Sequence, residues 1–230
     1  MKVLVADFDK TLFDENYIKN IESIKQFTDE GNVFVIATGR HKDLLIKDIK
    51  DYNITYSYLI CNDGAIIFDK EMNALYKKDI PKQTAIDILD ILNKSKFVSE
   101  PSIYTGFDIT NNIDGDVNGI YAKFSNRKEA SKLLDIIRQK HDNIDAYLSI
   151  EWINIIEKEV SKGRSIKYLA DKLGIDGNNV YTIGDGINDL SMSDYNFNSY
   201  AMEVGIDKLK KGTKGTYHAL YQLVEDIRKD

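Results

Sequence analysis

Residues 3–11 read VLVADFDKT, four apolar residues followed by two aspartates with one residue between them. An apolar run of this kind predicts a strand buried on both faces, as found inside parallel sheets. Side chains two positions apart in extended chain share a face, so the carboxylates of Asp7 and Asp9 are expected to lie close together. Two like charges about 4 Å apart repel by roughly 4 kcal/mol at an effective dielectric of about 20. The stretch therefore predicts a compensating group, and a divalent cation is the simplest one.

Alternating strand-like and helix-like segments follow this stretch as far as residue 80. A helical pattern at 17–31 precedes an apolar strand at 33–40, and a second helical pattern at 43–52 precedes a third strand at 56–64. This order of strands and helices favours an α/β fold with a doubly wound parallel sheet. Ligands of such sheets bind beyond the carboxyl ends of the strands. Two further apolar segments, joined by the polar KEMN, predict a hairpin appended to the sheet.

The pattern changes near Pro81 and returns to the first type after Glu159. Between them the chain reads as helix, extended chain, strand, helix and two strands, in the order αββαββ. That order is typical of a compact α+β unit with its own antiparallel sheet. We therefore expect a large α/β domain formed by residues 1–80 and 160–230, with a smaller α+β domain of residues 81–159 inserted into it.

Two candidate residues, Thr38 and Lys162, lie where a helix is expected to begin. Thr38, in ATGR, can cap the helix that follows, or it can hold an anion together with nearby backbone N–H groups. The sequence leaves both readings open. Lys162 opens a helix in EVSKGRSI, where a cation is disfavoured by the helix dipole. Arg164 and Lys158 are rivals for its role as a positive contact.

The segment VYTIGDGINDLSM begins as another buried strand and ends in a loop rich in oxygen ligands. Gly184 and Gly186 permit a tight turn, and Asp185, Asn188 and Asp189 project from the same loop. Carboxylate and amide oxygens are the ligands that Mg²⁺ prefers, usually shared with a phosphate. A dinucleotide-binding loop is excluded because an aspartate takes the place of its third glycine. The strand ends together predict a site for phosphate and Mg²⁺.

Composition limits the classes of partner and location. The net charge of −6 argues against a broad surface for nucleic acid or anionic membrane. No apolar run approaches the length of a transmembrane helix, and Met1 leads directly into the first strand, which leaves no room for a cleaved signal. The single Cys61 suits a reducing compartment. We expect a cytoplasmic protein, and the sequence leaves its oligomeric state open.

The four strand-end segments together resemble the motifs of the haloacid dehalogenase-like (HAD) superfamily of phosphohydrolases. DFDKT is similar to the first motif DxDxT, TGR to the second, Lys162 to the third and GDGIND to the fourth, in the same order. The inserted domain occupies the place of the α/β cap in the Cof-type phosphatases and their sugar-phosphatase relatives. CNDGA resembles the NGA segment of that group, with Asn62 and Gly64 near the active site.

This resemblance implies a role for each matched residue. Asp7 would be the nucleophile and Asp9 the general acid and base. Mg²⁺ would be held by Asp7, by the backbone carbonyl of Asp9 and by Asp185. Phosphate-binding residues would be Thr38, Gly39, Lys162 and Asn188, and supporting residues would be Thr11, Asp189, Asn62 and Arg40.

The resemblance implies a Mg²⁺-dependent phosphatase that acts on a small phosphorylated metabolite, with sugar phosphates as one candidate class. A phosphomutase, a phosphorylated signalling module and a non-catalytic phosphate-binding protein are the alternatives. The inserted domain would select the substrate. Its aromatic residues are expected mainly in its core: Tyr104, Phe107, Tyr121, Phe124, Tyr147 and Trp152. Four polar loop residues could contact a sugar or simply form turns: Asp108, Asn111, Asn112 and Asp114.

Overall fold

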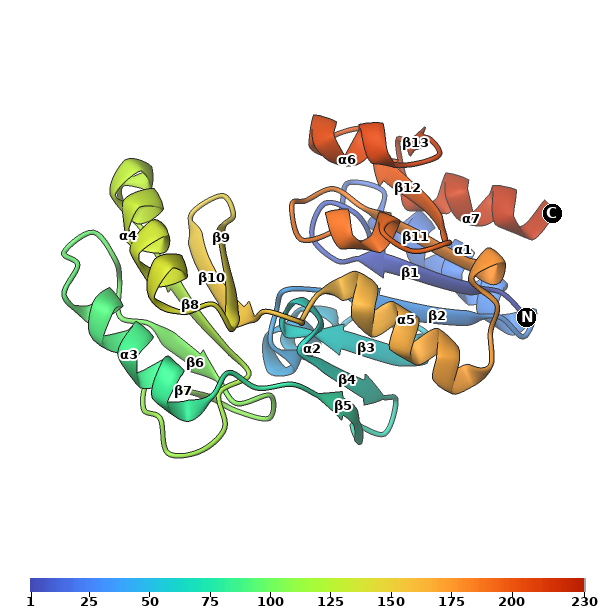
Figure 1. Cartoon of the computed structure of the whole chain (residues 1–230). Coiled ribbons are helices and arrows are strands. Elements are labelled where there is room, and N and C mark those ends of the chain that lie inside the picture. The colour runs from blue at the N-terminus through green and yellow to red at the C-terminus, as the bar shows by residue number, and fades with distance from the viewer. Residues whose placement is uncertain (230) are drawn as a thin grey trace.

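The computed structural model describes residues 1–229, which form two β-sheets with separate hydrophobic cores (Figure 1). The larger sheet has the strand order β13-β12-β11-β1-β2-β3-β4-β5, and the smaller sheet has the order β7-β6-β8-β10-β9. The chain leaves the larger sheet after β5 and returns to it through α5. The first and last parts of the chain therefore build one sheet together.

The larger sheet is parallel from β13 to β3 and antiparallel beyond it. Its strands are β1 (Val3–Asp7), β2 (Val33–Ala37), β3 (Tyr58–Cys61), β4 (Ile66–Asp69), β5 (Ala74–Lys77), β11 (Val180–Gly184), β12 (Asn198–Met202) and β13 (Thr216–Tyr217). Strand β1 is central, with β2 on one side and β11 on the other. The predicted buried strand at the start of the chain and the predicted α/β fold are confirmed.

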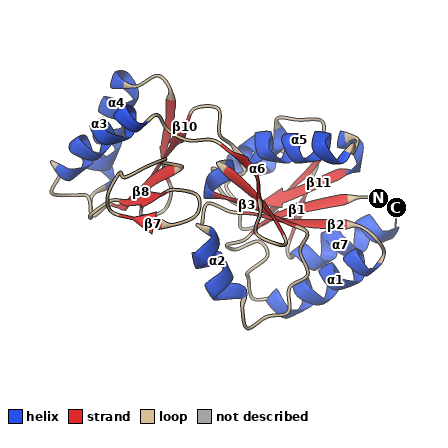
Figure 2. Ribbon diagram, turned by 90° about the horizontal axis from the view of Figure 1, so that it is seen from below, coloured by secondary structure: helices blue, strands red, loops and turns tan. Residues whose placement is uncertain are grey.

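Helices cover both faces of the larger sheet, as Figure 2 shows. One face packs against α1 (Tyr17–Asp29), α2 (Lys42–Ile49) and α7 (Leu220–Lys229), and the other against α5 (Lys162–Leu173). The side chains of β1 alternate between these layers: Leu4 faces the first and Val5 the second. Burial on both faces explains why this strand reads as an unbroken apolar run. The short α6 (Asp207–Gly212) follows β12.

The smaller sheet is antiparallel and packs against two helices. Its elements are α3 (Lys82–Asn93), β6 (Ser102–Tyr104), β7 (Ile109–Thr110), β8 (Gly119–Lys123), α4 (Arg127–Lys140), β9 (Ile144–Leu148) and β10 (Trp152–Glu157). The order is αβββαββ, one strand more than expected. The sequence predicted a single extended stretch before β8, but the chain reverses at Gly106 and forms the β6–β7 hairpin. Gly106 has a φ of +93°, a backbone conformation that few other residues adopt.

Among residues 1–229, no helix has the length and apolar character needed to cross a membrane.

Candidate active site

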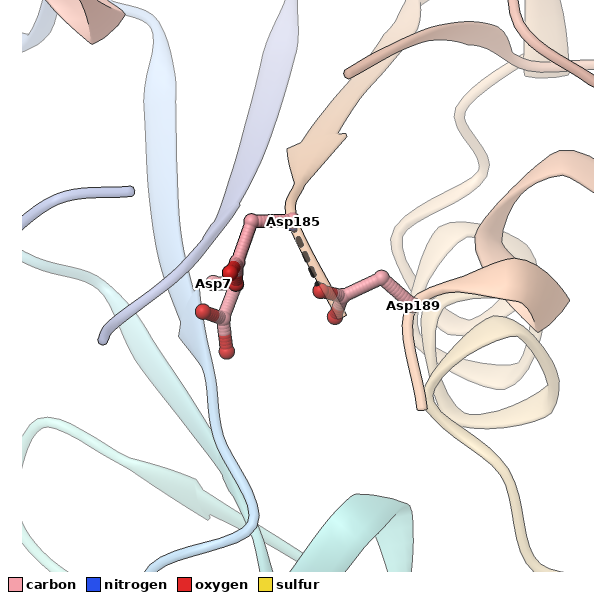
Figure 3. Close-up of side chains that lie close together, drawn as sticks. All are labelled: Asp7, Asp185 and Asp189. Carbon is pink, nitrogen blue, oxygen red and sulfur yellow. Dashed lines mark hydrogen bonds between the residues drawn. The ribbon is translucent and has the colours of Figure 1, made fainter. Parts of the chain in front are cut away.

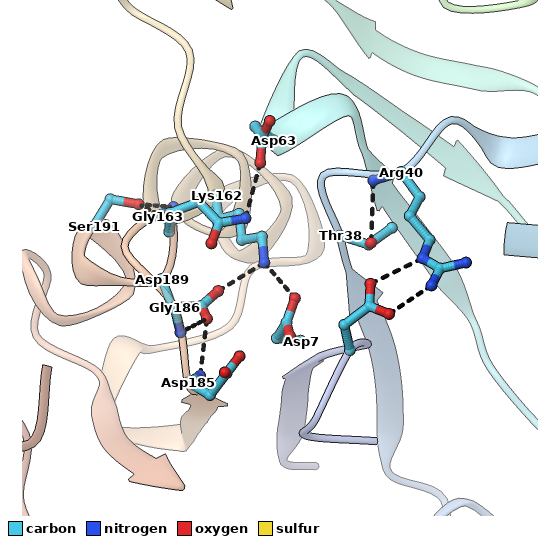
Figure 4. A network of polar contacts seen from close by, with 12 residues as sticks. Asp7, Thr38, Arg40, Asp63, Lys162, Gly163, Asp185, Gly186, Asp189 and Ser191 are labelled. Carbon is cyan, nitrogen blue, oxygen red and sulfur yellow. Dashed lines mark hydrogen bonds and ion pairs between the residues drawn. The ribbon is translucent and has the colours of Figure 1, made fainter. Parts of the chain in front are cut away.

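A buried lysine between two carboxylates forms the centre of the site (Figure 4). Lys162 is fully buried, and its Nζ donates to Asp7 Oδ1 and to Asp189 Oδ1, each at 2.6 Å. Asp7 ends β1, Lys162 begins α5 and Asp189 lies in the loop after β11. The group that compensates the charge of Asp7 is therefore an ammonium 155 residues away in the chain.

Close packing at the start of α5 places this lysine. The backbone N–H of Gly163 donates to Ser191 Oγ at 3.1 Å, in the 3₁₀ helix η3 (Leu190–Ser193). A Cβ at position 163 would collide with the carbonyl group of Ser191. Glycine thus allows α5 to approach η3, and the approach brings Lys162 beside Asp189.

Asp7, Asp185 and Asp189 form a cluster of carboxylates (Figure 3). One carboxylate oxygen from each lies within 4.8 Å of the others. Asp189 Oδ2 accepts the backbone N–H groups of Asp185 at 2.9 Å and Gly186 at 2.8 Å, which fixes the loop. Three carboxylates around one ammonium leave two formal negative charges without a partner in the cluster.

The pKa values of these groups follow from burial and from this surplus of negative charge. Burial raises the pKa of Asp7 well above its usual range; Lys162 opposes the shift, while Asp189 and Asp185 add to it. Burial and the charge of Asp189 raise the pKa of Asp185 to about 6. Burial disfavours the ammonium of Lys162, but Asp189 and Asp7 outweigh it and raise its pKa.

The donor chemistry of the cluster fits a hard divalent cation. Such ions bind carboxylate oxygens, and a charge of +2 would balance the surplus. Both oxygens of Asp189 already accept hydrogen bonds from the protein. Asp7 and Asp185 are therefore the side chains best placed to hold a metal ion.

Asp9 does not join this cluster. Strand β1 ends at Asp7 and the chain turns, so the expectation that extended chain would place the two carboxylates on one face is wrong. The carboxylate of Asp9 is half-exposed and forms a bidentate ion pair with Arg40 at 2.8 and 2.5 Å. Arg40 also bonds Asp48 of α2 and lies over the ring of Phe8.

The segment after β2 lies next to the cluster. Thr38 is buried, and its Oγ1 accepts the backbone N–H of Arg40 at 3.1 Å. The reading of Thr38 as the cap of α2 is wrong, because Nδ1 of His41 accepts the N–H of Asp43 at 3.3 Å and fills that position. Thr11, in the loop after β1, is also buried. Within the described residues its Oγ1 has no hydrogen-bond partner.

Asp63 was not expected in the site, yet it connects the two sheets. It is buried in η1 (Asn62–Gly64) with a φ of +58°. Its carboxylate accepts from Asn188 Nδ2 at 2.9 Å and from the hydroxyl of Tyr121, in β8, at 3.4 Å. Burial raises its pKa. In the sequence, the only indication of this role was the polar pair Asn62 and Asp63 between two apolar strands.

Asn62 lies at the same junction. It is buried, and its Nδ2 donates to Asn118 Oδ1 at 2.6 Å. Asn118, just before β8, donates in turn to the carbonyls of Ala65 and Lys78 at 3.0 and 2.7 Å. Asn62 thus ties the larger sheet to the smaller one.

A cavity of about 940 Å³ lies between the two sheets and reaches the cluster. Its floor includes Asp7, Asp9 and Asp185, and its opposite wall includes Tyr147 and Trp152 of the smaller sheet. A group that enters this cavity can therefore contact the carboxylates from the side of the smaller sheet.

The sequence matches the family of haloacid dehalogenase-like hydrolases over residues 4–151 and 94–218. Among curated proteins, it is 28% identical to a protein of Buchnera aphidicola subsp. Baizongia pistaciae with a provisional phosphatase assignment, over 91% of this chain and 89% of that protein.

Solved structures show the same fold. A haloacid dehalogenase-like hydrolase from Bacillus subtilis superposes with a TM-score of 0.87 at 18% identity, over 98% of this chain and 99% of that one. A sugar phosphatase of HAD subclass IIB superposes with a TM-score of 0.82 at 17% identity, over 100% and 98% of the two chains.

Proposed function

Because the chain belongs to the haloacid dehalogenase-like hydrolases and is a phosphohydrolase, we propose that it hydrolyses the phosphomonoester of a small metabolite through a covalent intermediate on Asp7. The observation that carries the proposal is the contact of Asp7 with the buried Lys162 at the floor of the cavity. The ammonium holds the carboxylate in place at the floor and supplies positive charge where phosphoryl oxygens would bind.

The reaction takes two steps on this chain. The carboxylate of Asp7 attacks phosphorus, the bond to the leaving oxygen breaks, and Asp9 gives that oxygen a proton. Water then attacks phosphorus and gives a proton to Asp9, the bond between phosphorus and the Asp7 oxygen breaks, and inorganic phosphate leaves the regenerated carboxylate. Gly39 and Asn188 line the cavity together with Asp7, and Thr38 follows β2, the strand beside β1. We propose that these three residues bind the phosphoryl oxygens with Lys162.

Arg40 orients Asp9 as a carboxylate, the form that accepts a proton from water in the second step, and the pair must open for Asp9 to carry the proton of the first step. The bidentate pair fixes the carboxylate at the rim of the cavity, where Asp9 and Arg40 are both lining residues. A carboxyl group held there meets the leaving oxygen from the side of the smaller sheet. Asp189 supports the loop that carries Asp185 by accepting two backbone N–H groups, and we propose a supporting role for Thr11 in the loop after Asp7.

We propose Mg²⁺ as the cation of the cluster, held by Asp7, Asp185 and the backbone carbonyl of Asp9. When bound, it would neutralise charge between the nucleophile and the phosphoryl group. The net charge of the cluster and its oxygen donors support this assignment.

We further propose that residues 81–159 act as a cap over the site. The cavity between the sheets supports this role, because a substrate in it is enclosed by both. Sugar phosphates are the first class to test, since one structural relative is a sugar phosphatase.

The test is phosphate release from a panel of phosphorylated metabolites with Mg²⁺. Asp7→Asn should lower kcat by about a thousandfold or more, since the amide cannot form the intermediate. Asp171→Asn, at an exposed carboxylate on α5, is the control and should keep full activity. A phosphomutase would transfer phosphate without releasing it. Unchanged phosphate release by Asp7→Asn would overturn the mechanism.

A further inference from the structure

Exposed apolar side chains gather around the cavity between the sheets. Ile150 lies in the turn between β9 and β10 and is 75% exposed, and Val204, just after β12, is 70% exposed. Ile187, Ile206 and Leu44 are also exposed and line the same cavity. Single exposed apolar residues are ordinary, but these five come from four separate segments. Apolar residues gathered at one functional cavity indicate a binding surface.

Two charged side chains on the wall formed by the smaller sheet already have partners in the protein. Arg127 donates to the carbonyls of Ser149 and Ile150 at 3.1 and 3.4 Å. Glu151 forms an ion pair with Lys123 at 2.7 Å. These contacts shape the β9–β10 turn and leave these two charged groups less free to contact the hydroxyls of a sugar.

Asn154 also uses its amide donor within the protein. Its Nδ2 donates to Ser149 Oγ at 3.1 Å and to the carbonyls of Tyr147 and Trp152 at 3.4 and 3.2 Å. Four loop residues were left as candidates either for contact with a sugar or for turns, and in the described part of the chain none of them lines this cavity: Asp108, Asn111, Asn112 and Asp114.

The cavity is large enough to hold an apolar group in addition to a phosphoryl group. At about 940 Å³ it is at the upper end of the range of pockets that enclose an organic ligand of drug size. A phosphoryl group at the carboxylates fills only one end. Most of the remaining wall is apolar or aromatic, with Leu148, Trp152 and Tyr104 alongside the exposed residues.

We propose that the cavity selects phosphomonoesters whose leaving group carries a bulky apolar or aromatic part, seated between the β9–β10 turn and the loops after β11 and β12. This inference rests on the proposed function and narrows its substrate class. The polar end of such an ester meets Asp7 and Asp9, and its apolar end contacts Ile150 and Val204. Simple sugar phosphates leave that apolar wall without a partner.

The experiment compares three esters of primary alcohols with the full chain and Mg²⁺: propyl phosphate, 3-phenylpropyl phosphate and glucose 6-phosphate. Their leaving groups have similar reactivity, so differences in kcat/KM report contacts in the cavity. Burying the phenyl ring should raise kcat/KM over that of the propyl ester by about tenfold or more. The phenylpropyl ester should also exceed glucose 6-phosphate.

Two matched variants test whether the preference for the phenylpropyl ester arises in this cavity. Ile150→Ser removes an exposed side chain from the cavity and should lower the preference for the phenylpropyl over the propyl ester by about threefold or more. Ile136→Ser, at an exposed position on α4 that does not line the cavity, should leave the preference unchanged. Both residues are exposed, so neither substitution threatens folding.

Three results would overturn the inference. Equal kcat/KM for the propyl and phenylpropyl esters would do so while phosphate release still supported the proposed function. If Ile150→Ser lowered kcat/KM equally for all three esters, the apolar residues would instead serve as a contact between the two sheets. Absence of phosphate release from every ester would overturn the proposed function along with the inference.

Discussion

Replacing Lys162 by methionine removes the positive charge that Asp7 and Asp189 share in the buried cluster and keeps a side chain of similar length. Both carboxylates bond to this ammonium at 2.6 Å, and the lysine has no exposed surface. Breaking a buried ion pair from one side leaves an uncompensated charge and costs about 3–5 kcal/mol. For a chain of this size, that loss should lower Tm by roughly 6–20 °C.

The loss should depend on pH. The pKa of Asp7 is already raised by burial, and without Lys162 it rises further. A carboxyl group with a raised pKa contributes stability that is present at low pH and lost as pH rises through that pKa. The destabilisation by Lys162→Met should therefore be larger at pH 7.5 than at pH 5. Lys162 itself, with a raised pKa, stays charged throughout this window.

The assay is urea unfolding followed by circular dichroism at both pH values, with a chelator present so that no cation replaces the lost charge. Lys167→Met is the matched control, because Lys167 lies on the same helix and pairs with Asp171 in an exposed ion pair. Such pairs contribute about 0–1 kcal/mol. The reasoning fails if the two variants lose equal stability, or if the loss in Lys162→Met is the same at both pH values.

Three further outcomes are expected. Asp185→Asn should raise the Tm of the metal-free protein relative to the parent by an amount that grows from pH 5 to pH 7.5, because a carboxyl pKa raised to about 6 costs stability that accumulates as pH rises from the ordinary value through about 6. Mg²⁺ should raise the Tm of the parent and not of the variant, and the reverse pattern would contradict the assigned metal site. Asn118→Ala should cost about 1–3 kcal/mol in urea unfolding, since the buried Nδ2 of Asn62 loses its acceptor and the carbonyl of Lys78 loses this donor, and a neutral result would show that water replaces the amide. Gly163→Ala should cost about 1–3 kcal/mol because its Cβ meets backbone, whereas Gly115→Ala, with open space around it, should stay within about 0.5 kcal/mol of the parent.

Local pattern was enough to predict six strands of the larger sheet and the positions of Asp7 and Asp185, whereas β12 and β13 were not predicted. Strand β1 is buried on both faces, so it reads as an apolar run, and its last residue, Asp7, lies at the carboxyl end of the strand. Strand β11 is buried in the same way, and Asp185 directly follows it. Parallel strands end at the same side of the sheet, so the pattern predicted acids along that side, and the family resemblance implied that Asp7 and Asp185 meet there.

The strands of the smaller sheet were harder to predict from the sequence. A strand of three residues and one of two, β6 and β7, form only because Gly106 reverses the chain between them. Strands this short carry too little alternation to be separated from a single extended segment. The start of α2 was misread for a similar reason, since an imidazole takes the place of the usual hydroxyl cap.

Partners across long sequence distances were decided by tertiary structure alone. The sequence showed that Asp7 needs a compensating charge, that Lys162 opens a helix and that glycines turn the loop at residue 185. It did not show that the lysine lies between Asp7 and Asp189, that Arg40 holds Asp9 away from them, or that Asp63 reaches the smaller sheet. Periodicity and turn residues record the local backbone and its burial, whereas charge pairing depends on which segments the packing of the two cores brings together.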